Sequence, residues 1–273
     1  MIKRVGKQIY ITKENLDLLK DILVKAKKIV FFGGAGVSTA SGIPDFRSKD
    51  GIYRKKSYSK DANESLLTHR SYKENKEEFL TKYRNSLKAS PKFPNPAHLA
   101  LKELEDQGKL LGIITQNVDG LHQKAGSANI IELHGNHSRQ HCEDCGKKYD
   151  QNWYLQEEGI RYCEDCGGIV RPEMVLFGER VDQRLINQAI ELVEQAEVFI
   201  IGGSALKVYP ATGLLRHYHG DKMIYINEEE NSKDKRMDYI VRGDISKILP
   251  ELVKKKETSS KNYLDSTSVL QKA

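Results

Sequence analysis

A short apolar run that leads into a glycine-rich turn constrains this sequence more than any other feature. Residues 29–32 are apolar and end at glycine, which predicts a buried strand. The turn contains Gly34, Ala35 and Gly36, and free backbone N–H groups at such a place can bind an anion such as a phosphate. The spacing departs from G-x-G-x-x-G, because Thr39 stands at the third glycine position. Taken alone, the turn fits a nucleotide cradle or an ordinary glycine-rich loop.

The segment after this turn is unusual for a dinucleotide-binding fold. Gly42 and Pro44 interrupt the helix that would normally follow. Asp45, Phe46 and Arg47 then place an acid, an aromatic ring and a guanidinium side by side. A phosphate cradle joined to such a loop indicates a nucleotide whose second, reactive end is also held.

Apolar runs alternate with amphipathic segments along much of the remaining chain. We expect buried strands at 29–32, 110–115, 198–201, 223–226 and 239–241, and helices at 12–28, 96–107, 185–195, 211–218 and 245–253. Residues 8–11 are expected to form an edge strand or an extended arm. This alternation predicts an α/β fold with a doubly wound parallel sheet. Ligands of such sheets bind at the carboxyl ends of the strands, where the loops after Phe32, Thr115 and Ile201 should meet.

All four cysteines fall in one stretch, as two C-x-x-C pairs. Cys142 and Cys145 are separated from Cys163 and Cys166 by 17 residues. This spacing predicts a structural zinc site with four thiolate ligands and no open position. Disulfides are disfavoured in a reducing compartment, and a redox role would need only one pair. Acidic residues between the cysteines disfavour nucleic-acid binding.

Two polar stretches are candidates for a catalytic site. Gln116, Asn117 and Asp119 follow an expected strand and offer groups that can fix a carboxamide or a ribose, although such residues also form ordinary turns. His134 ends a second apolar run. A histidine in that position can act as a general base near neutral pH, or it can be a buried structural residue.

Charge and hydropathy exclude several classes of protein. The chain has 44 basic and 38 acidic residues, and part of the excess of +6 lies in a lysine-rich tail after residue 253 that we expect to be disordered. The remaining charge is too small to indicate a dedicated nucleic-acid binder. No apolar run could span a bilayer and no signal-peptide pattern opens the chain, so we expect a cytoplasmic protein with no membrane partner.

Taken together and in order, these motifs resemble the sirtuins, the NAD-dependent protein-lysine deacylases, and most closely their bacterial and undifferentiated members. The resemblance runs from about residue 15 to 253. Its motifs are a cofactor loop at 34–53, a nicotinamide and ribose loop at 116–119, a catalytic histidine at His134, a substrate-binding strand at 171–179, a second nucleotide loop at 203–210 and a strand end at 226–227.

The resemblance implies a particular domain organisation. A Rossmann-like NAD-binding domain would comprise 13–47, 96–133 and 180–253. A flexible cofactor loop with a helical insertion would occupy 48–95. A zinc-ribbon module and the substrate-binding strand would occupy 134–179, and a disordered basic tail 254–273.

The resemblance also implies an activity, NAD-dependent protein-lysine deacetylation. The acyl-lysine carbonyl oxygen would attack the ribose of NAD, nicotinamide would leave, and His134 would act as general base, assisted by Asn117. The products would be free lysine, nicotinamide and O-acyl-ADP-ribose. Such chemistry requires orientation and one base, because the cofactor supplies the electrophile. A monomer that acts on acyl-lysine proteins or peptides is expected, with NAD and one structural zinc ion bound.

The resemblance implies site residues at the positions that match its motifs. Cofactor contacts would come from Gly34, Ala35, Gly36, Thr39, Asp45, Phe46, Arg47, Gln116, Asn117, Val118, Asp119, Gly203, Ser204, Asn227 and Ile245. Substrate contacts would come from Val118, Val175, Leu176, Phe177 and Gly178, with the peptide added as a strand.

Two departures from the family pattern bear on this reading. Ala205 stands where many sirtuins have a hydroxyl residue, so one cofactor hydrogen bond would be missing. Leu80 stands where sirtuins that remove succinyl groups have a tyrosine, which favours acetyl or another neutral acyl group.

Two alternatives use the same site differently. The protein could transfer ADP-ribose to other proteins, although sirtuins specialised in that way tend to lack the residues matched by His134 and Asn117. It could also be a non-catalytic NAD-sensing scaffold, but binding alone requires no general base.

Overall fold

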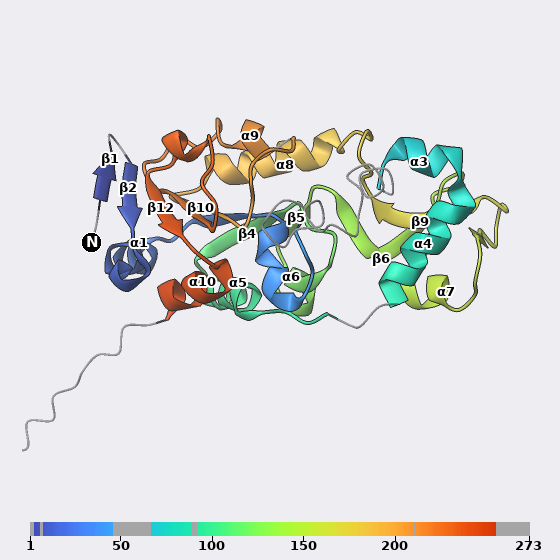
Figure 1. Ribbon diagram of the computed structural model, residues 1–273, viewed down its shortest axis with the longest axis horizontal. Helices are drawn as coiled ribbons and strands as arrows, with labels where there is room; N and C mark the ends of the chain where they lie inside the picture. Colours follow the sequence, from blue (N-terminus) through green and yellow to red (C-terminus); the bar gives the residue numbers. More distant parts are fainter. Residues whose placement is uncertain (1–2, 6–7, 46–66, 89–91, 210, 255–273) are drawn as a thin grey trace, which may run out of the picture.

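The computed structural model describes residues 3–5, 8–45, 67–88, 92–209 and 211–254 (Figure 1). The predictions made for Phe46 and Arg47, for the remainder of the cofactor loop through residue 66, and for the tail from 255 onward lie outside these ranges.

A large sheet of eight strands forms one end of the molecule (Figure 1). Its order is β1 (Lys3–Val5), β2 (Gln8–Ile11), β12 (Tyr239–Arg242), β11 (Met223–Asn227), β10 (Val198–Gly202), β3 (Ile29–Gly33), β4 (Leu110–Thr115) and β5 (Ile130–Glu132). Only the β1–β2 pair is antiparallel among these strands. The predicted doubly wound parallel sheet is confirmed. β2 is not at the edge, because it pairs with both β1 and β12.

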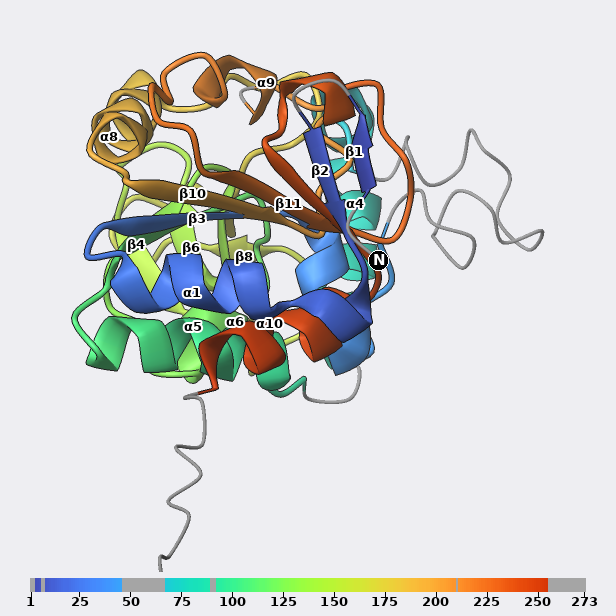
Figure 2. The same cartoon turned by 90° about the vertical axis from the view of Figure 1, so that its left-hand side faces the viewer.

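Helices cover both faces of this sheet (Figure 2). One face carries α1 (Asp17–Lys25), α5 (Pro96–Asp106) and α10 (Ile245–Val253), and the other carries α8 (Gln183–Glu194) and α9 (Ala211–Leu214). Side chains of a strand alternate between faces. Ile29 and Phe31 of β3 therefore pack into the core under α1, α5 and α10, whereas Val30 and Phe32 pack into the core under α8.

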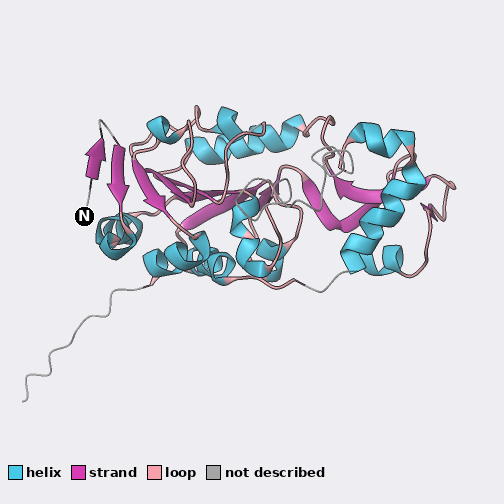
Figure 3. Cartoon of the chain, in the orientation of Figure 1, coloured by secondary structure: helices cyan, strands magenta, loops and turns pink. Residues whose placement is uncertain are grey.

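A small antiparallel sheet lies at the other end of the molecule (Figure 3). Its order is β7 (Lys148–Asp150), β6 (Gly135–Cys142), β9 (Ile169–Met174) and β8 (Arg161–Tyr162), with α7 (Gln151–Leu155) after β7. The helical insertion contains α3 (His69–Glu74) and α4 (Lys76–Lys88), which pack Tyr72, Phe79 and Leu80 around Leu176. The small module and the helical insertion of the predicted fold class are thus both present.

The structure agrees with one local prediction, the interruption at Gly42, and corrects the bounds of two helices. The glycine-rich turn continues into two short 3-10 turns that end at Gly42, whose φ of +78° stops the helix as expected. The first helix starts later than predicted, because a 3-10 turn occupies Lys13–Asn15 and α1 begins at Asp17. α9 ends at Leu214, before the predicted end at residue 218. The backbone hydrogen bonds that follow run from the Arg216 N–H to the Gly213 carbonyl oxygen and from the His217 N–H to that of Leu214, which is the 3-10 pattern.

No helix within the described ranges has the length and apolarity required to cross a bilayer.

Candidate active site

A cavity of about 1330 Å³ lies at the carboxyl ends of β3, β4 and β10 and extends to the small sheet. The structure brings most of the predicted site residues to its wall. These are Gly34, Ala35, Gly36, Asp45, Gln116, Asn117, Val118, Asp119, His134, Val175, Leu176, Phe177, Gly178, Gly203 and Ser204. Sequence segments more than a hundred residues apart therefore share one cavity, as expected for loops at one edge of a parallel sheet.

Three predicted cofactor residues do not line this cavity. Thr39 is exposed and its hydroxyl donates to the Gly36 carbonyl oxygen at 3.1 Å. Asn227 ends β11 and its amide donates to the Glu229 carbonyl oxygen at 3.1 Å. Ile245 is buried in the core, where its Cδ1 packs against Gly202. The cofactor contacts predicted for these three residues therefore stay predictions.

Two glycine loops pack directly against each other at the cavity wall. The Gly34 N–H donates to the Gly202 carbonyl oxygen at 3.2 Å, and the Gly36 N–H to that of Gly203 at 2.8 Å. A Cβ on Gly203, where φ is +57°, would lie 2.4 Å from the Val37 nitrogen. Glycine is thus required for close backbone approach. The second loop thus accepts both of these N–H groups, and the cofactor contacts predicted for Gly34 and Gly36 stay predictions.

A buried hydroxyl joins the glycine-rich turn to the polar loop. Ser38 donates to Asp119 Oδ2 at 2.7 Å and accepts from the Asn117 side-chain amide at 3.1 Å. Asp119 Oδ1 also accepts the Leu121 N–H at 2.9 Å. Ser38 lines the cavity and was missed in the sequence, where only its place within the turn could have indicated it. These bonds fix the orientations of Asn117 and Asp119 before any ligand binds.

Asn95 fixes the same turn from the opposite side. Its amide donates to the Val37 carbonyl oxygen at 2.8 Å and to the Ser41 hydroxyl at 2.9 Å, while its side-chain oxygen caps α5. The proline-rich stretch around it predicted a loop end and gave no sign of this contact. The turn is therefore held at both ends by buried side chains.

Gln116 leaves one hydrogen-bonding group unused. Its backbone N–H donates to the Gly33 carbonyl oxygen at 3.0 Å, and its side chain lies on the cavity wall. The Nε2 atom is buried and has no hydrogen-bond partner among the residues that the structure describes. A buried donor of this kind is costly unless a ligand or water accepts it. The donor set thus fits a ligand with carbonyl or hydroxyl groups, as in the carboxamide and ribose of NAD.

His134 lies at the junction of these loops and has the electrostatics of a general base. Its Nδ1 is 3.0 Å from the Gln116 carbonyl oxygen, which can only accept, so the neutral ring carries its proton on Nδ1 and keeps a lone pair on Nε2. Burial lowers the pKa of His134 below 6.5, and hydrogen bonds to the backbone of Gln116 and Tyr209 offset this only in part. The imidazole is therefore neutral, and able to accept a proton, at pH 7.

The predicted substrate strand is already paired along one edge. Phe177 exchanges hydrogen bonds of 2.9 Å with Leu67 and His69, and the Val175 N–H donates to the His134 carbonyl oxygen at 2.9 Å. Phe177 remains 36% exposed on the cavity wall. On the opposite edge, the Leu176 N–H donates to Glu179 Oε2 at 2.8 Å and the Leu176 carbonyl oxygen accepts from the Glu179 N–H at 2.9 Å.

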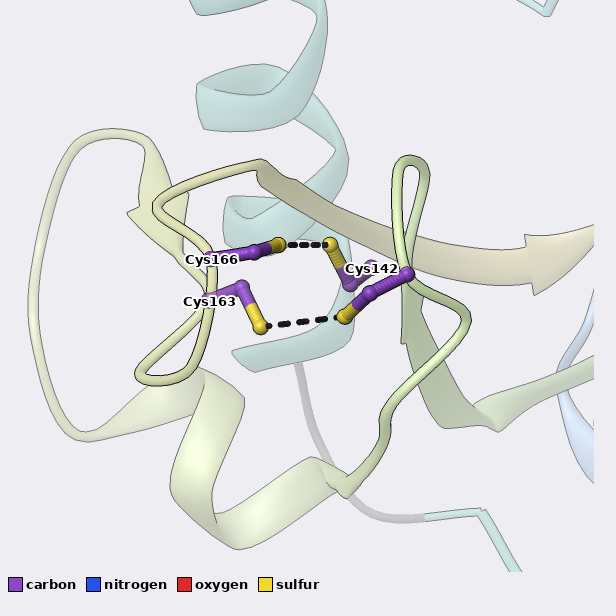
Figure 4. Close-up of side chains that lie close together, drawn as sticks. Cys142, Cys163 and Cys166 are labelled. Atoms are coloured by element: carbon purple, nitrogen blue, oxygen red, sulfur yellow. Dashed lines mark hydrogen bonds between the residues drawn. The ribbon is translucent and has the colours of Figure 1, made fainter.

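The four cysteine sulfurs form a compact cluster in the small sheet (Figure 4). All lie within 4.8 Å of one another, and the pairs Cys142–Cys166 and Cys145–Cys163 are 3.5 Å apart. A tetrahedral zinc ion with Zn–S bonds of about 2.3 Å places its sulfurs about 3.8 Å apart. The Tyr149 hydroxyl donates to Cys163 at 3.2 Å, and this bond lowers the pKa of the Cys163 thiol to about 6. The donor set fits a structural zinc ion.

Comparison with protein families identifies the chain. Residues 34–210, more than half of it, match the Sir2 family. The chain belongs to the Sir2 family. The sirtuin resemblance indicated by the sequence is thereby confirmed.

Relatives and solved structures agree with this membership. The chain is 42% identical over 241 residues to the NAD-dependent protein deacetylase of Clostridium acetobutylicum, covering 88% of this chain and 98% of the relative. It is 44% identical over 243 residues to that of Clostridium tetani, covering 89% and 97%. A structure described as "Structural Basis for the Mechanism and Regulation of Sir2 Enzymes" has a TM-score of 0.76 and 38% identity, and "Sir2-p53 peptide-NAD+" has 0.75 and 33%. Each covers 87% of this chain and 97% of its own.

Proposed function

We propose that this Sir2 protein is an NAD-dependent protein deacetylase that removes acetyl or another neutral acyl group from lysine side chains. The observation that carries the proposal is the neutral, half-buried His134 on the wall of a cavity shared by the two nucleotide loops and residues 175–178. The name carried by the Clostridium relatives supports the same activity. NAD, when bound, supplies the electrophilic ribose carbon that accepts the acyl-lysine oxygen.

Each residue of the site then has a role. Gln116 and Asn117 orient the carboxamide and the ribose of NAD through their side-chain amides. The hydrogen bond from Ser38 fixes the orientation of the Asp119 carboxylate. His134 takes a proton from a ribose hydroxyl at its Nε2. Val118, Val175 and Phe177 enclose the neutral acyl-lysine stem in an apolar passage that excludes water.

The zinc ion has a supporting role. Four thiolates complete a tetrahedral shell, so the metal has no open position for substrate. We propose that it stabilises the ribbon at 134–179, which holds the substrate strand against the NAD-binding segments at 13–47, 96–133 and 180–253.

Mass spectrometry of an acetyl-lysine peptide incubated with NAD tests the function. We compare the wild type with His134→Ala and with His217→Ala, a change at a histidine that lies away from the cavity. Loss of acetyl with appearance of O-acetyl-ADP-ribose is expected for the wild type and His217→Ala. Loss of a general base should slow His134→Ala by about 100-fold or more.

Other products would select the alternatives. A peptide that gains ADP-ribose would replace this proposal with the transferase. Bound NAD without either product, across several acyl groups, would indicate the scaffold. Circular dichroism of both variants shows whether loss of activity reflects loss of folding.

A further inference from the structure

Two exposed cations stand on the cavity wall beside the residues proposed to bind the peptide. Arg180 follows Gly178 by two positions, and Lys207 lies in the loop after β10. Neither forms an ion pair within the ranges that the structure describes, whereas Lys148, an exposed cation of the small sheet, pairs with Glu173 at 2.9 Å.

The carboxylates next to Arg180 are occupied by other partners. Glu179 accepts two hydrogen bonds from Arg171, at 2.8 and 3.2 Å, one from the Leu176 N–H at 2.8 Å, and lies 2.9 Å from His69 Nδ1. Asp182 pairs with Arg184 at 2.8 Å and caps α8. Glu179 and Asp182 are thus engaged elsewhere, although they adjoin Arg180 in the sequence.

The remainder of the wall is balanced in formal charge, so the net positive charge among its described residues comes from Arg180 and Lys207. Among the described residues of the wall, the cations are Lys82, Lys92, Lys124, Arg180 and Lys207, and the carboxylates are Asp45, Asp119 and Glu179. Asp119 is buried, and both of its carboxylate oxygens accept hydrogen bonds, from Ser38 and the Leu121 N–H. A rim with a net positive charge attracts acidic ligands and raises their association rate.

Resting on the proposed deacetylase function, we propose that this protein selects peptides with acidic residues beside the acyl-lysine. Main-chain pairing along residues 175–178 carries no sequence preference of its own. Arg180 and Lys207 line the same cavity as residues 175–178, so they are placed to contact the peptide residues that flank the acyl-lysine. An Asp or Glu side chain in the peptide supplies the carboxylate partner that neither cation has among the described residues.

Peptide pairs that differ only in charge test this selectivity. We compare acetyl-lysine peptides with Glu or Gln at the two positions on each side, measuring Kd by fluorescence anisotropy without NAD and kcat/KM with NAD. The Glu peptide should bind about two- to fivefold more tightly per effective charge, as for solvent-exposed ion pairs. The difference should shrink as salt rises from about 50 to 500 mM, because exposed charges are screened.

Variants assign the preference to the two cations. Arg180→Gln and Lys207→Gln should each reduce the Glu-to-Gln ratio, and the double variant should bring it close to one. Arg184→Gln is the matched control, because Arg184 pairs with Asp182 and does not line the cavity, so it should keep the wild-type ratio.

Three results would overturn the inference. Equal affinity for Glu and Gln peptides would remove the preference while leaving the deacetylase intact. A preference that survives in the double variant would place its origin elsewhere. A change in the Kd of NAD, with no change in the peptide ratio, would assign the cations to the cofactor. Because the anisotropy ratio requires no turnover, it tests the inference even if no peptide is deacetylated.

Discussion

The two sheets of this protein are stabilised by different means. In the large sheet, every residue of β3 and β10 is buried, and apolar side chains fill both faces. The small sheet has few buried apolar side chains near its cysteines, chiefly Tyr149, Tyr154 and Val170. A sheet of short strands cannot bury enough apolar surface to be stable alone, so other interactions must contribute.

Around the small sheet, additional stability comes from arginines stacked on aromatic rings and from the four thiols. Arg84, Arg161 and Arg171 lie over the rings of Tyr154, Trp153 and Tyr72, with 4.6, 3.9 and 4.7 Å between guanidinium carbon and ring centroid. The large sheet has one comparable contact, between Arg242 and Tyr225 at 5.6 Å, among the described residues. Cation–π contacts and a bound metal ion thus contribute stability to the small sheet that apolar burial provides in the large sheet.

Removing zinc should reveal the largest difference in stability between the two sheets. Chelation, or Cys142→Ser, should abolish amide hydrogen-exchange protection in β6 and β9 while β3 and β10 stay protected. In small folds a structural zinc ion contributes about 10 kcal/mol or more. Asp165→Asn is the control, since it changes a neighbouring charge and keeps all four thiols. Equal loss of protection in both sheets would show that they unfold as one unit.

Truncating a core side chain of the large sheet should lower the free energy of unfolding and leave the zinc site intact. Phe199 is fully buried and its ring centroid lies 5.7 Å from that of Tyr218. Phe199→Ala should lower the free energy of unfolding by about 3–5 kcal/mol, because it leaves a cavity. Urea unfolding measures this loss. Zinc content per chain should stay at the wild-type value below the urea transition, and a lowered content would contradict independent stabilisation.

Acid should weaken the large sheet through two buried histidines. His98 and His122 have ring centroids 4.8 Å apart, and burial lowers their pKa values to about 4 and about 3. The unfolded chain binds protons near pH 6.5, so their contribution to stability is present above that pH and declines as the pH falls. Each should cost about 2 kcal/mol between pH 7 and 5. His122→Leu should reduce this pH dependence in urea unfolding, and an unchanged slope would exclude the assignment.

A half-buried carboxylate should affect the small sheet in a lower pH window. Burial alone would raise the pKa of Glu179, but hydrogen bonds from Arg171, Leu176 and His69 lower it to about 2. Its contribution is therefore present above about pH 4.5 and is lost as the pH falls towards 2. Glu179→Gln should remove about 2–3 kcal/mol at pH 7. Exchange at the Leu176 amide, which donates to Glu179, should rise and the KM for peptide should increase, whereas a purely global effect would leave KM unchanged.

The smallest effect is expected at an exposed pair. Arg70 and Glu74 form an ion pair at 2.7 Å on the outer face of α3. Because both side chains are largely in water, Arg70→Gln should leave the thermal unfolding midpoint unchanged within error. A clear shift would mean that surface charge, in addition to buried pairs, stabilises the helical insertion.

Comparing the sequence with the structure shows which interactions are local. The strands at β3, β4, β10, β11 and β12 were predicted to within a residue or so, because each is a continuous apolar run. The cysteine cluster followed from its spacing, since two short turns suffice to bring four sulfurs together. By contrast, β7 and β8 are short and rich in polar residues, so their periodicity gave no signal.

The features of the site also fall into those that local sequence predicts and those that depend on tertiary contacts. The sequence by itself determined the parallel sheet, the thiol cluster and the loops in which the site residues lie, because these depend on neighbouring residues and on regular spacing. Only the tertiary structure decided that the Gly34 and Gly36 N–H groups bond the second loop, that Ser38 joins Asn117 to Asp119, and that Ile245 packs in the core. These depend on distances between segments far apart in the chain, which no local pattern records.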